Sequence, residues 1–266
     1  MNEPSSDDVL RRTRFFEEES YGEVAVLRFG LHIPERVTDL DEAGRLWEFL
    51  AGRRGDPKKV ILIVNAPGSL SPAGIDEFWD HIHSDHSRTG SASAETLDLL
   101  RLAREENALK HFVEIVRKTD SFVISAIQGE CDFCFLGTSL ACDYRIAAHD
   151  TVFVNRLFES ETTAGVLPWF LSRFLGHAEA ADILLEGRSL TAGEAYQLKL
   201  VNQLALPANL EETALETARR FAGVPAAALR ALKRSLVASV ENMGVYLDQI
   251  GTGFQHVKGP PATGTW

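Results

Sequence analysis

Short apolar runs alternate along the chain with segments of helical periodicity. Four runs are rich in Val, Ile, Leu and Ala and predict strands: 24–29, 60–64, 122–127 and 144–148. Residues 40–50 and 95–118 instead repeat apolar residues every three or four positions, which predicts helices, and the polar stretch 84–95 between them predicts a loop. This alternation of strands and helices predicts an α/β fold.

The two ends of the chain differ from this middle part. Residues 1–20 are charged and predict a loose N-terminal arm. From residue 209 onward the pattern is helical, and it contains two apolar stripes: Leu210, Leu215, Ala218 and Phe221, then Leu229, Leu232, Leu236 and Val240. The sequence therefore predicts an arm over 1–20, an α/β core over 21–205 and a helical C-terminal region over 206–266.

Composition and charge narrow the possible partners. The chain has 266 residues, of which 45% are hydrophobic, and a net charge of -11 from 38 acidic and 27 basic residues. This balance argues against a general nucleic-acid or anionic-membrane surface, since either needs a basic face. No apolar run is long enough to cross a bilayer, and the start of the chain has no apolar signal core, so we expect a cytoplasmic protein.

The segment 122–148 carries a specific resemblance. Ala126–Gly129 and Ala141–Ala147 match, without a gap, the glycine-ended strand and the Ala-Cys-Asp-x-Arg-Ile-Ala strand of the enoyl-CoA hydratase/isomerase (crotonase) family. Three further matches follow in the family's order: Ser71–Asp76, Leu184–Ala195 and Leu200–Asn202. Because these collinear motifs span most of residues 24–205, the chain resembles a divergent member of that family.

The resemblance implies a fold, an assembly and a ligand. The fold would be a spiral of β-β-α units with a helical C-terminal region that mediates oligomerisation, so a homo-trimer or hexamer is expected. The substrate would be an acyl-CoA or acyl-carrier thioester, with coenzyme A as part of the substrate, no separate cofactor and no metal.

Family enzymes bind the thioester oxygen with two backbone N–H groups, which stabilise the charge of an enolate. The matching donors here are Ile75 and Cys134. Cys134 replaces the usual glycine, and the turn Cys131–Cys134 contains no glycine, so the geometry of the second donor depends on the local backbone.

The catalytic glutamates of hydratases are absent. Their aligned positions are Gly137 and Leu157, neither of which can transfer a proton or hold the attacking water. We therefore expect no ordinary hydratase activity. Glu159 and Glu161, on the loop that carries the second glutamate in hydratases, are candidate replacements, and the alternative is that both are solvated loop carboxylates.

The resemblance also implies coenzyme A contacts. They would involve Pro34, Ala73 and Gly74, with Phe254 and Lys258 as candidates for the nucleotide end. Phe254 and Lys258 are equally compatible with ordinary surface roles.

Several other polar groups have a simpler structural interpretation. Asp132 could be a base, but turns favour aspartate for local backbone hydrogen bonds. The cluster His81, His83 and His86 suggests a metal site, but a solvated helix end explains it better, and one histidine as an acid/base group is the main alternative. The cysteines Cys131, Cys134 and Cys142 could be grouped with His149 as a zinc set, but buried reduced thiols explain their spacing better.

Two functional hypotheses follow. The first is an acyl-CoA enzyme of the hydratase/isomerase family that acts through a thioester enolate, as a lyase or isomerase with non-standard catalytic residues. The second is a catalytically inactive binding or scaffold protein with the same fold. Exchange of the α-proton of an acyl-CoA separates them, because only the first hypothesis requires it.

Overall fold

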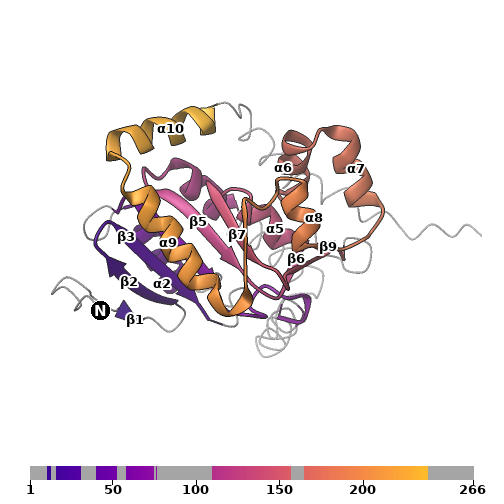
Figure 1. Cartoon of the computed structure of the whole chain (residues 1–266), viewed down its shortest axis with the longest axis horizontal. Coiled ribbons are helices and arrows are strands. Elements are labelled where there is room, and N and C mark those ends of the chain that lie inside the picture. Colours follow the sequence, from indigo (N-terminus) through magenta and orange to yellow (C-terminus); the bar gives the residue numbers. More distant parts are fainter. Residues whose placement is uncertain are drawn as a thin grey trace, which may run out of the picture.

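The computed structural model describes residues 11–12, 16–30, 40–52, 58–74, 76, 110–156 and 165–238. Its main element is a seven-stranded sheet of order β1-β2-β3-β4-β5-β7-β10 (Figure 1). The strands are β1 (Arg11–Arg12), β2 (Phe16–Tyr21), β3 (Val24–Phe29), β4 (Val60–Asn65), β5 (Phe122–Ile127), β7 (Tyr144–Ala148) and β10 (Gln203–Ala205). From β3 to β10 neighbouring strands run parallel, whereas β1, β2 and β3 are antiparallel.

A smaller sheet of order β6-β8-β9 lies beside the first, built from β6 (Glu130–Asp132), β8 (Val152–Val154) and β9 (Leu190–Thr191). Strand β5 of the large sheet continues into β6 of the small one, followed by α5 (Phe133–Ser139), and β7 continues into β8, later followed by α6 (Leu167–Phe174). This repeated β-β-α order is the predicted crotonase-like α/β spiral, and that prediction is confirmed. The remaining helices before β10 are α7 (His177–Leu185) and α8 (Ala192–Gln197).

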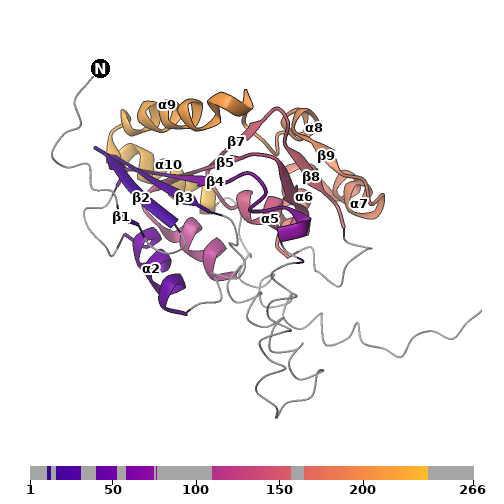
Figure 2. The ribbon, with the colours of Figure 1, turned by 90° about the horizontal axis from the view of Figure 1, so that it is seen from below.

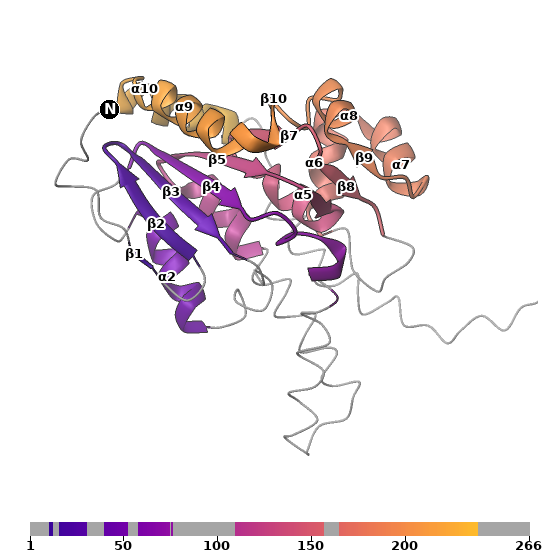
Figure 3. The same cartoon turned by 60° about the horizontal axis from the view of Figure 1, so that its bottom comes forward.

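Helices cover both faces of the large sheet, as Figures 2 and 3 show. On one face, α9 (Leu210–Ala222) buries Leu210, Ala214 and Ala218 against the inward side chains of β3, β4 and β5. On the other face, α2 (Leu40–Leu50) and the helical residues 110–118 pack against the alternate side chains of the same strands. Burial on both faces explains why these strands are continuous apolar runs.

The predicted N-terminal arm is wrong for its last residues. Residues 16–20 belong to β2, which pairs along its whole length with β3. Phe16 is buried and lies 6.0 Å from Phe29 between ring centroids. The acidic side chain of Glu19 accepts a 2.6 Å hydrogen bond from Arg28, which also donates to Glu211 of α9. At least one of the charges that indicated an arm, that of Glu19, is therefore held by a cross-strand contact.

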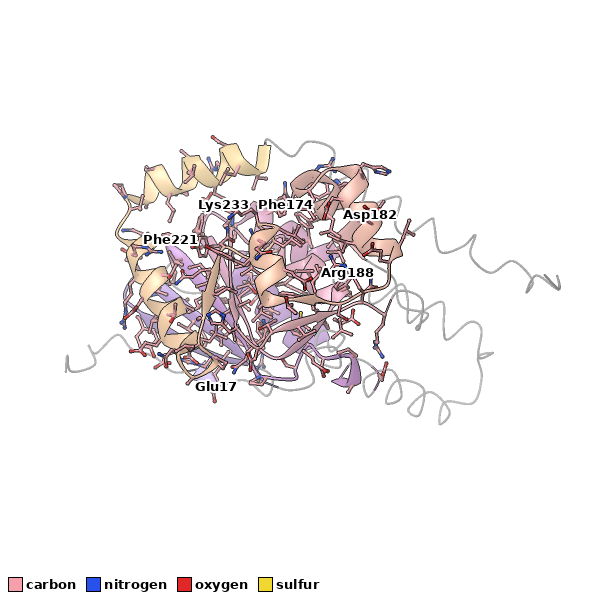
Figure 4. All side chains as sticks on the ribbon, turned by 45° about the vertical axis from the view of Figure 1, so that its right-hand side comes forward. Glu17, Phe174, Asp182, Arg188, Phe221 and Lys233 are labelled. Carbon is pink, nitrogen blue, oxygen red and sulfur yellow. The ribbon has the colours of Figure 1, made fainter. Side chains whose placement is uncertain are left out.

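The C-terminal helices are confirmed as far as residue 238, but the second apolar stripe is not one buried face. In α10 (Ala226–Ala238) Leu229 is buried, whereas Leu232 and Leu236 are 53% and 51% exposed. The buried face of α10 instead includes Lys233, whose side chain Figure 4 labels beneath the helix. Val240 lies outside the described residues.

The ammonium group of Lys233 contacts two backbone carbonyl oxygens and one carboxylate. Its Nζ donates at 2.7 Å to the carbonyl oxygens of Val116 and Ser121 and lies 2.9 Å from Asp143 Oδ2. Asp143 in turn accepts a 2.7 Å bond from the Val123 N–H. A buried ammonium is stable only with such partners, so this pair fixes α10 to the start of β5.

Candidate functional site

Two turns meet where the resemblance places the thioester. The first follows β4 and spans residues 66–76, and the second joins β5 through β6 to α5. The Asp132 N–H donates a 2.8 Å hydrogen bond to the Leu70 carbonyl, which ties the second turn to the first. Gly129, with a φ of +75°, brings the start of β6 close to Pro67 and Gly68. The turns before and after which the expected donors lie are therefore adjacent.

The first turn is compact because its residues are small and bonded to each other. Ser71 Oγ donates to the Gly68 carbonyl at 2.8 Å and accepts from the Gly74 N–H at 3.2 Å. A Cβ on Gly74 would come 3.2 Å from the Gly68 oxygen, so a side chain there would crowd the turn. Ala73 is exposed and Gly74 half-buried at this place. Their assignment to coenzyme A binding stays a prediction.

Cys134 lies in the first turn of α5, where helix N–H groups have no partner within the helix. Among the described residues, Lys199 is the one non-glycine residue with a positive φ, so Cys134 needs no left-handed backbone in place of the family's glycine. Its N–H donates at 2.8 Å to Oδ1 of Asp132, the N-cap residue of α5. The expected local backbone hydrogen bond of Asp132 is confirmed and caps α5, so the N–H assigned as a donor at Cys134 already has a carboxylate partner.

Asp132 is buried and also approaches a cation. Its residue is 4% exposed, and its Oδ2 lies 3.6 Å from Nε of Arg156. Burial raises the pKa of Asp132, while the Cys134 N–H and the charge of Arg156 act in the opposite direction. Asp132 is thus a carboxylate whose ionised form is disfavoured by its surroundings.

Arg156 connects three segments of the site. It follows β8 and forms a two-pronged ion pair with Asp76, at 2.8 Å and 3.1 Å, and its Nη2 also donates to the Pro72 carbonyl at 3.3 Å. These bonds join the first turn to the end of β8, with Asp132 between them. The hydrogen bond with Asp76 raises the pKa of Arg156 further above its already high value, so this residue stays charged.

Gly137, the position expected to align with the first hydratase glutamate, is tightly packed. A Cβ at this position would lie 2.8 Å from the backbone nitrogen of Leu167 and 3.0 Å from its Cα. Those atoms belong to the start of α6, which cannot yield as a flexible side chain would. The close packing of α5 on α6 therefore leaves no room for a glutamate at residue 137.

Several predicted residues lie outside the described part of the chain. They are Pro34, Ile75, His81, His83, His86, Leu157, Glu159, Glu161, Phe254 and Lys258. The three cysteines are described: Cys131, Cys134 and Cys142 are buried, and none of them forms a disulfide bond. Burial raises the pKa of Cys142 to about 12, and also raises that of Cys131. Within the described residues, no three or more His, Cys, Asp or Glu side chains group so as to hold a metal ion.

Sequence reasoning missed Arg156. Its only signal was a basic residue two positions after the end of β8 and one position before Leu157, which is expected to align with the second hydratase glutamate. The family motifs that sequence reasoning did find are largely structural. Asn202 Oδ1 accepts from the Arg145 N–H, and the buried Arg145 side chain donates to the Leu200 carbonyl. Thr191 and Glu194 form a capping box that begins α8.

Comparison with known protein families identifies the family of this chain. Residues 100–252, more than half of the chain, match the family model described as enoyl-CoA hydratase/isomerase. The chain belongs to the enoyl-CoA hydratase/isomerase family. The resemblance inferred from the sequence motifs is therefore confirmed, while the roles of individual residues at the site stay predictions.

Individual relatives differ in how much of them the chain covers. A peroxisomal bifunctional enzyme of Cavia porcellus is 33% identical over 142 residues, which are 52% of this chain and 19% of that protein. The enoyl-CoA isomerase/hydratase fer4 of Mycosarcoma maydis is 28% identical over 196 residues, 71% of this chain and 65% of that protein. The chain thus spans less than two thirds of either relative. Because the first relative is named as peroxisomal, the cytoplasmic location stays a prediction.

Solved structures of the family support the fold. A monofunctional enoyl-CoA isomerase from M. smegmatis superimposes with a TM-score of 0.63 at 25% identity, covering 89% of this chain and 99% of that one. An enoyl-CoA hydratase structure from Geobacillus kaustophilus gives 0.68 at 19% identity, covering 94% and 90%. Among the described helices, none combines the length and the apolar character needed to cross a membrane.

Proposed function

We propose that this family member binds an acyl-CoA or acyl-carrier thioester and acts through its enolate, with catalytic groups other than the two hydratase glutamates. The observation that carries the proposal is the junction of the two turns at the start of α5. The Asp132 N–H, two residues before Cys134, donates to the Leu70 carbonyl of the turn that also contains Ala73 and Gly74, which supports Cys134 as a donor at the positive end of a helix. That is the arrangement the family needs for a thioester oxygen.

The chemistry of this site follows from where charge develops. When the Cα–H bond of a thioester breaks, negative charge moves to the carbonyl oxygen. N–H groups that are already aimed at this oxygen stabilise the charge without rearranging. Cys134 and Ile75 are the proposed donors. Since residue 137 has no room for a side chain, the proton must be carried by another group, and Glu159 and Glu161 are the first candidates.

The remaining assignments are part of the same proposal. Pro34, Ala73 and Gly74 would contact the coenzyme, with Phe254 or Lys258 at its nucleotide end. The protein would act in the cytoplasm as a homo-trimer or hexamer. The exposed leucines of α10, Leu232 and Leu236, leave an apolar surface that suits a subunit contact.

A second function is favoured by one specific observation. The Asp132 carboxylate accepts the hydrogen bond of Cys134 that a thioester oxygen would need. A protein that had lost catalysis would tolerate such a contact, so an inactive binding or scaffold protein is the alternative.

Isotope exchange tests the proposal. The protein is incubated in D₂O with acetyl-, butyryl- and octanoyl-CoA, and deuterium at the α-carbon is followed by mass spectrometry. Parallel samples contain crotonyl-CoA to measure hydration. We expect exchange with at least one thioester and no hydration above the rate without protein. Binding of thioesters without exchange in any sample would support the scaffold function instead.

A further inference from the structure

We propose that Asp132 is the proton acceptor of this site, released for that role when a thioester oxygen takes its place on the Cys134 N–H. The inference rests on the proposed function, because it requires a thioester bound at that donor. It assigns to a described residue the role for which the sequence offered Glu159 and Glu161.

The first argument is position. Oδ1 of Asp132 lies 2.8 Å from the Cys134 nitrogen. A thioester oxygen bound to the same N–H would lie at about 2.9 Å from that nitrogen, in the place that Oδ1 now takes. Covalent geometry puts the α-carbon of the thioester about 2.4 Å from its carbonyl oxygen. A carboxylate displaced from this N–H, still attached to the residue before α5, would lie near the carbon that loses its proton.

The second argument is that the displaced carboxylate has another partner nearby. Nε of Arg156 lies 3.6 Å from Oδ2 of Asp132, and Arg156 is held in place by Asp76 and the Pro72 carbonyl. A small rotation of the Asp132 side chain away from Cys134 would keep it next to this guanidinium. The anion does not need to move into solvent, and it is not left in the protein interior without compensation.

The third argument is that binding makes the carboxylate a stronger base. Burial already raises the pKa of Asp132, and the hydrogen bond from the Cys134 N–H opposes that rise. When the thioester oxygen takes this N–H, the opposing bond is lost and the pKa of Asp132 rises further. The gain in basicity comes only with substrate in place. Asp76 also faces Asp132 and raises its pKa, whereas Arg156 lowers it.

The proton transfer balances without another reactant. The Cα–H bond breaks, and its electron pair forms the C=C bond of the enolate. Negative charge moves to the thioester oxygen, where the Cys134 N–H stabilises it, and the proton passes to a carboxylate oxygen of Asp132. Return of a solvent-derived deuteron from Asp132 to the α-carbon completes one exchange.

Asp132→Asn tests this role while preserving the cap of α5. Asparagine and aspartate are comparable N-cap residues, so the asparagine oxygen can still accept from the Cys134 N–H, but it cannot take a proton. Asp132→Ser is a second variant that also caps and lacks the acid. The matched control is Asp182→Asn, which alters an exposed acid on α7 (Figure 4).

Exchange rates and thioester affinities are measured for all variants, with circular dichroism as a check of folding. We expect both Asp132 variants to lose exchange by about 100-fold or more, with thioester affinity retained and Asp182→Asn unchanged. Exchange in a folded Asp132 variant within about threefold of the parent protein overturns this inference but leaves the proposed function standing. No exchange by the parent protein overturns both.

Discussion

Gly137 gives the sharpest prediction about the packing of the site. In an ordinary helix, Gly→Ala is stabilising by roughly 1 kcal/mol, because alanine loses less backbone entropy. At Gly137 the added Cβ would meet backbone atoms of Leu167 at 2.8 Å and 3.0 Å, closer than such contacts occur. Overpacking of a well-filled interior costs typically about 1–3 kcal/mol. We therefore expect the cost to offset or exceed the gain, so that Gly137→Ala lowers the free energy of unfolding by up to about 2 kcal/mol.

Urea unfolding of Gly137→Ala and of a control, Gly44→Ala, measures this effect. Gly44 lies inside α2, and a Cβ there would meet nothing within 4 Å, so the control should be as stable as the parent protein or slightly more. Gly137→Glu should be less stable still and should not hydrate crotonyl-CoA, because its carboxylate would have to enter the same contact. If Gly137→Ala stabilises the protein as much as Gly44→Ala does, the inferred crowding at residue 137 is refuted.

Three further changes have defined outcomes. Lys233→Met leaves Asp143 buried without its ammonium partner. Urea titrations should therefore show a free energy of unfolding that is lower by about 3–5 kcal/mol. A decrease below about 1 kcal/mol would contradict the pairing. The Cys142 thiol, whose pKa burial raises to about 12, should not react with a thiol reagent at pH 8 until the protein is unfolded. Rapid reaction of Cys142 in the native protein, mapped by mass spectrometry, would contradict its burial. Arg156→Gln removes a charge that lowers the pKa of Asp132, so that pKa should rise and the onset of exchange should move to higher pH, whereas an unchanged profile would exclude their coupling.

The fold could be predicted well for strands that are buried on both faces of the sheet. Strands β3, β5 and β7 were expected with their observed bounds, because a strand covered on both faces is a continuous apolar run. Strand β2 was missed because three consecutive glutamates look like a solvated arm. Arg28, which pairs with Glu19, belongs to the next strand, and nothing in the local pattern shows that the two are paired.

The site was predictable only in part for a related reason. The motifs located the two turns and the position of Gly137, because short-range spacing carries that information. The contacts of Arg156 with Asp76 and Asp132 join segments far apart in the sequence, and the space around Gly137 is set by α6. Such facts depend on how the elements pack. The buried position of Lys233 within an apparently apolar stripe was unpredictable for the same reason.

The most direct test of the central claim is the mass of butyryl-CoA recovered after incubation with the unmodified protein in D₂O. An enzyme that forms the thioester enolate without the hydratase glutamates should add deuterium at the α-carbon, at a rate proportional to protein concentration, and should leave crotonyl-CoA unhydrated. Hydration of crotonyl-CoA in proportion to protein concentration, or butyryl-, acetyl- and octanoyl-CoA recovered without deuterium, would contradict the account.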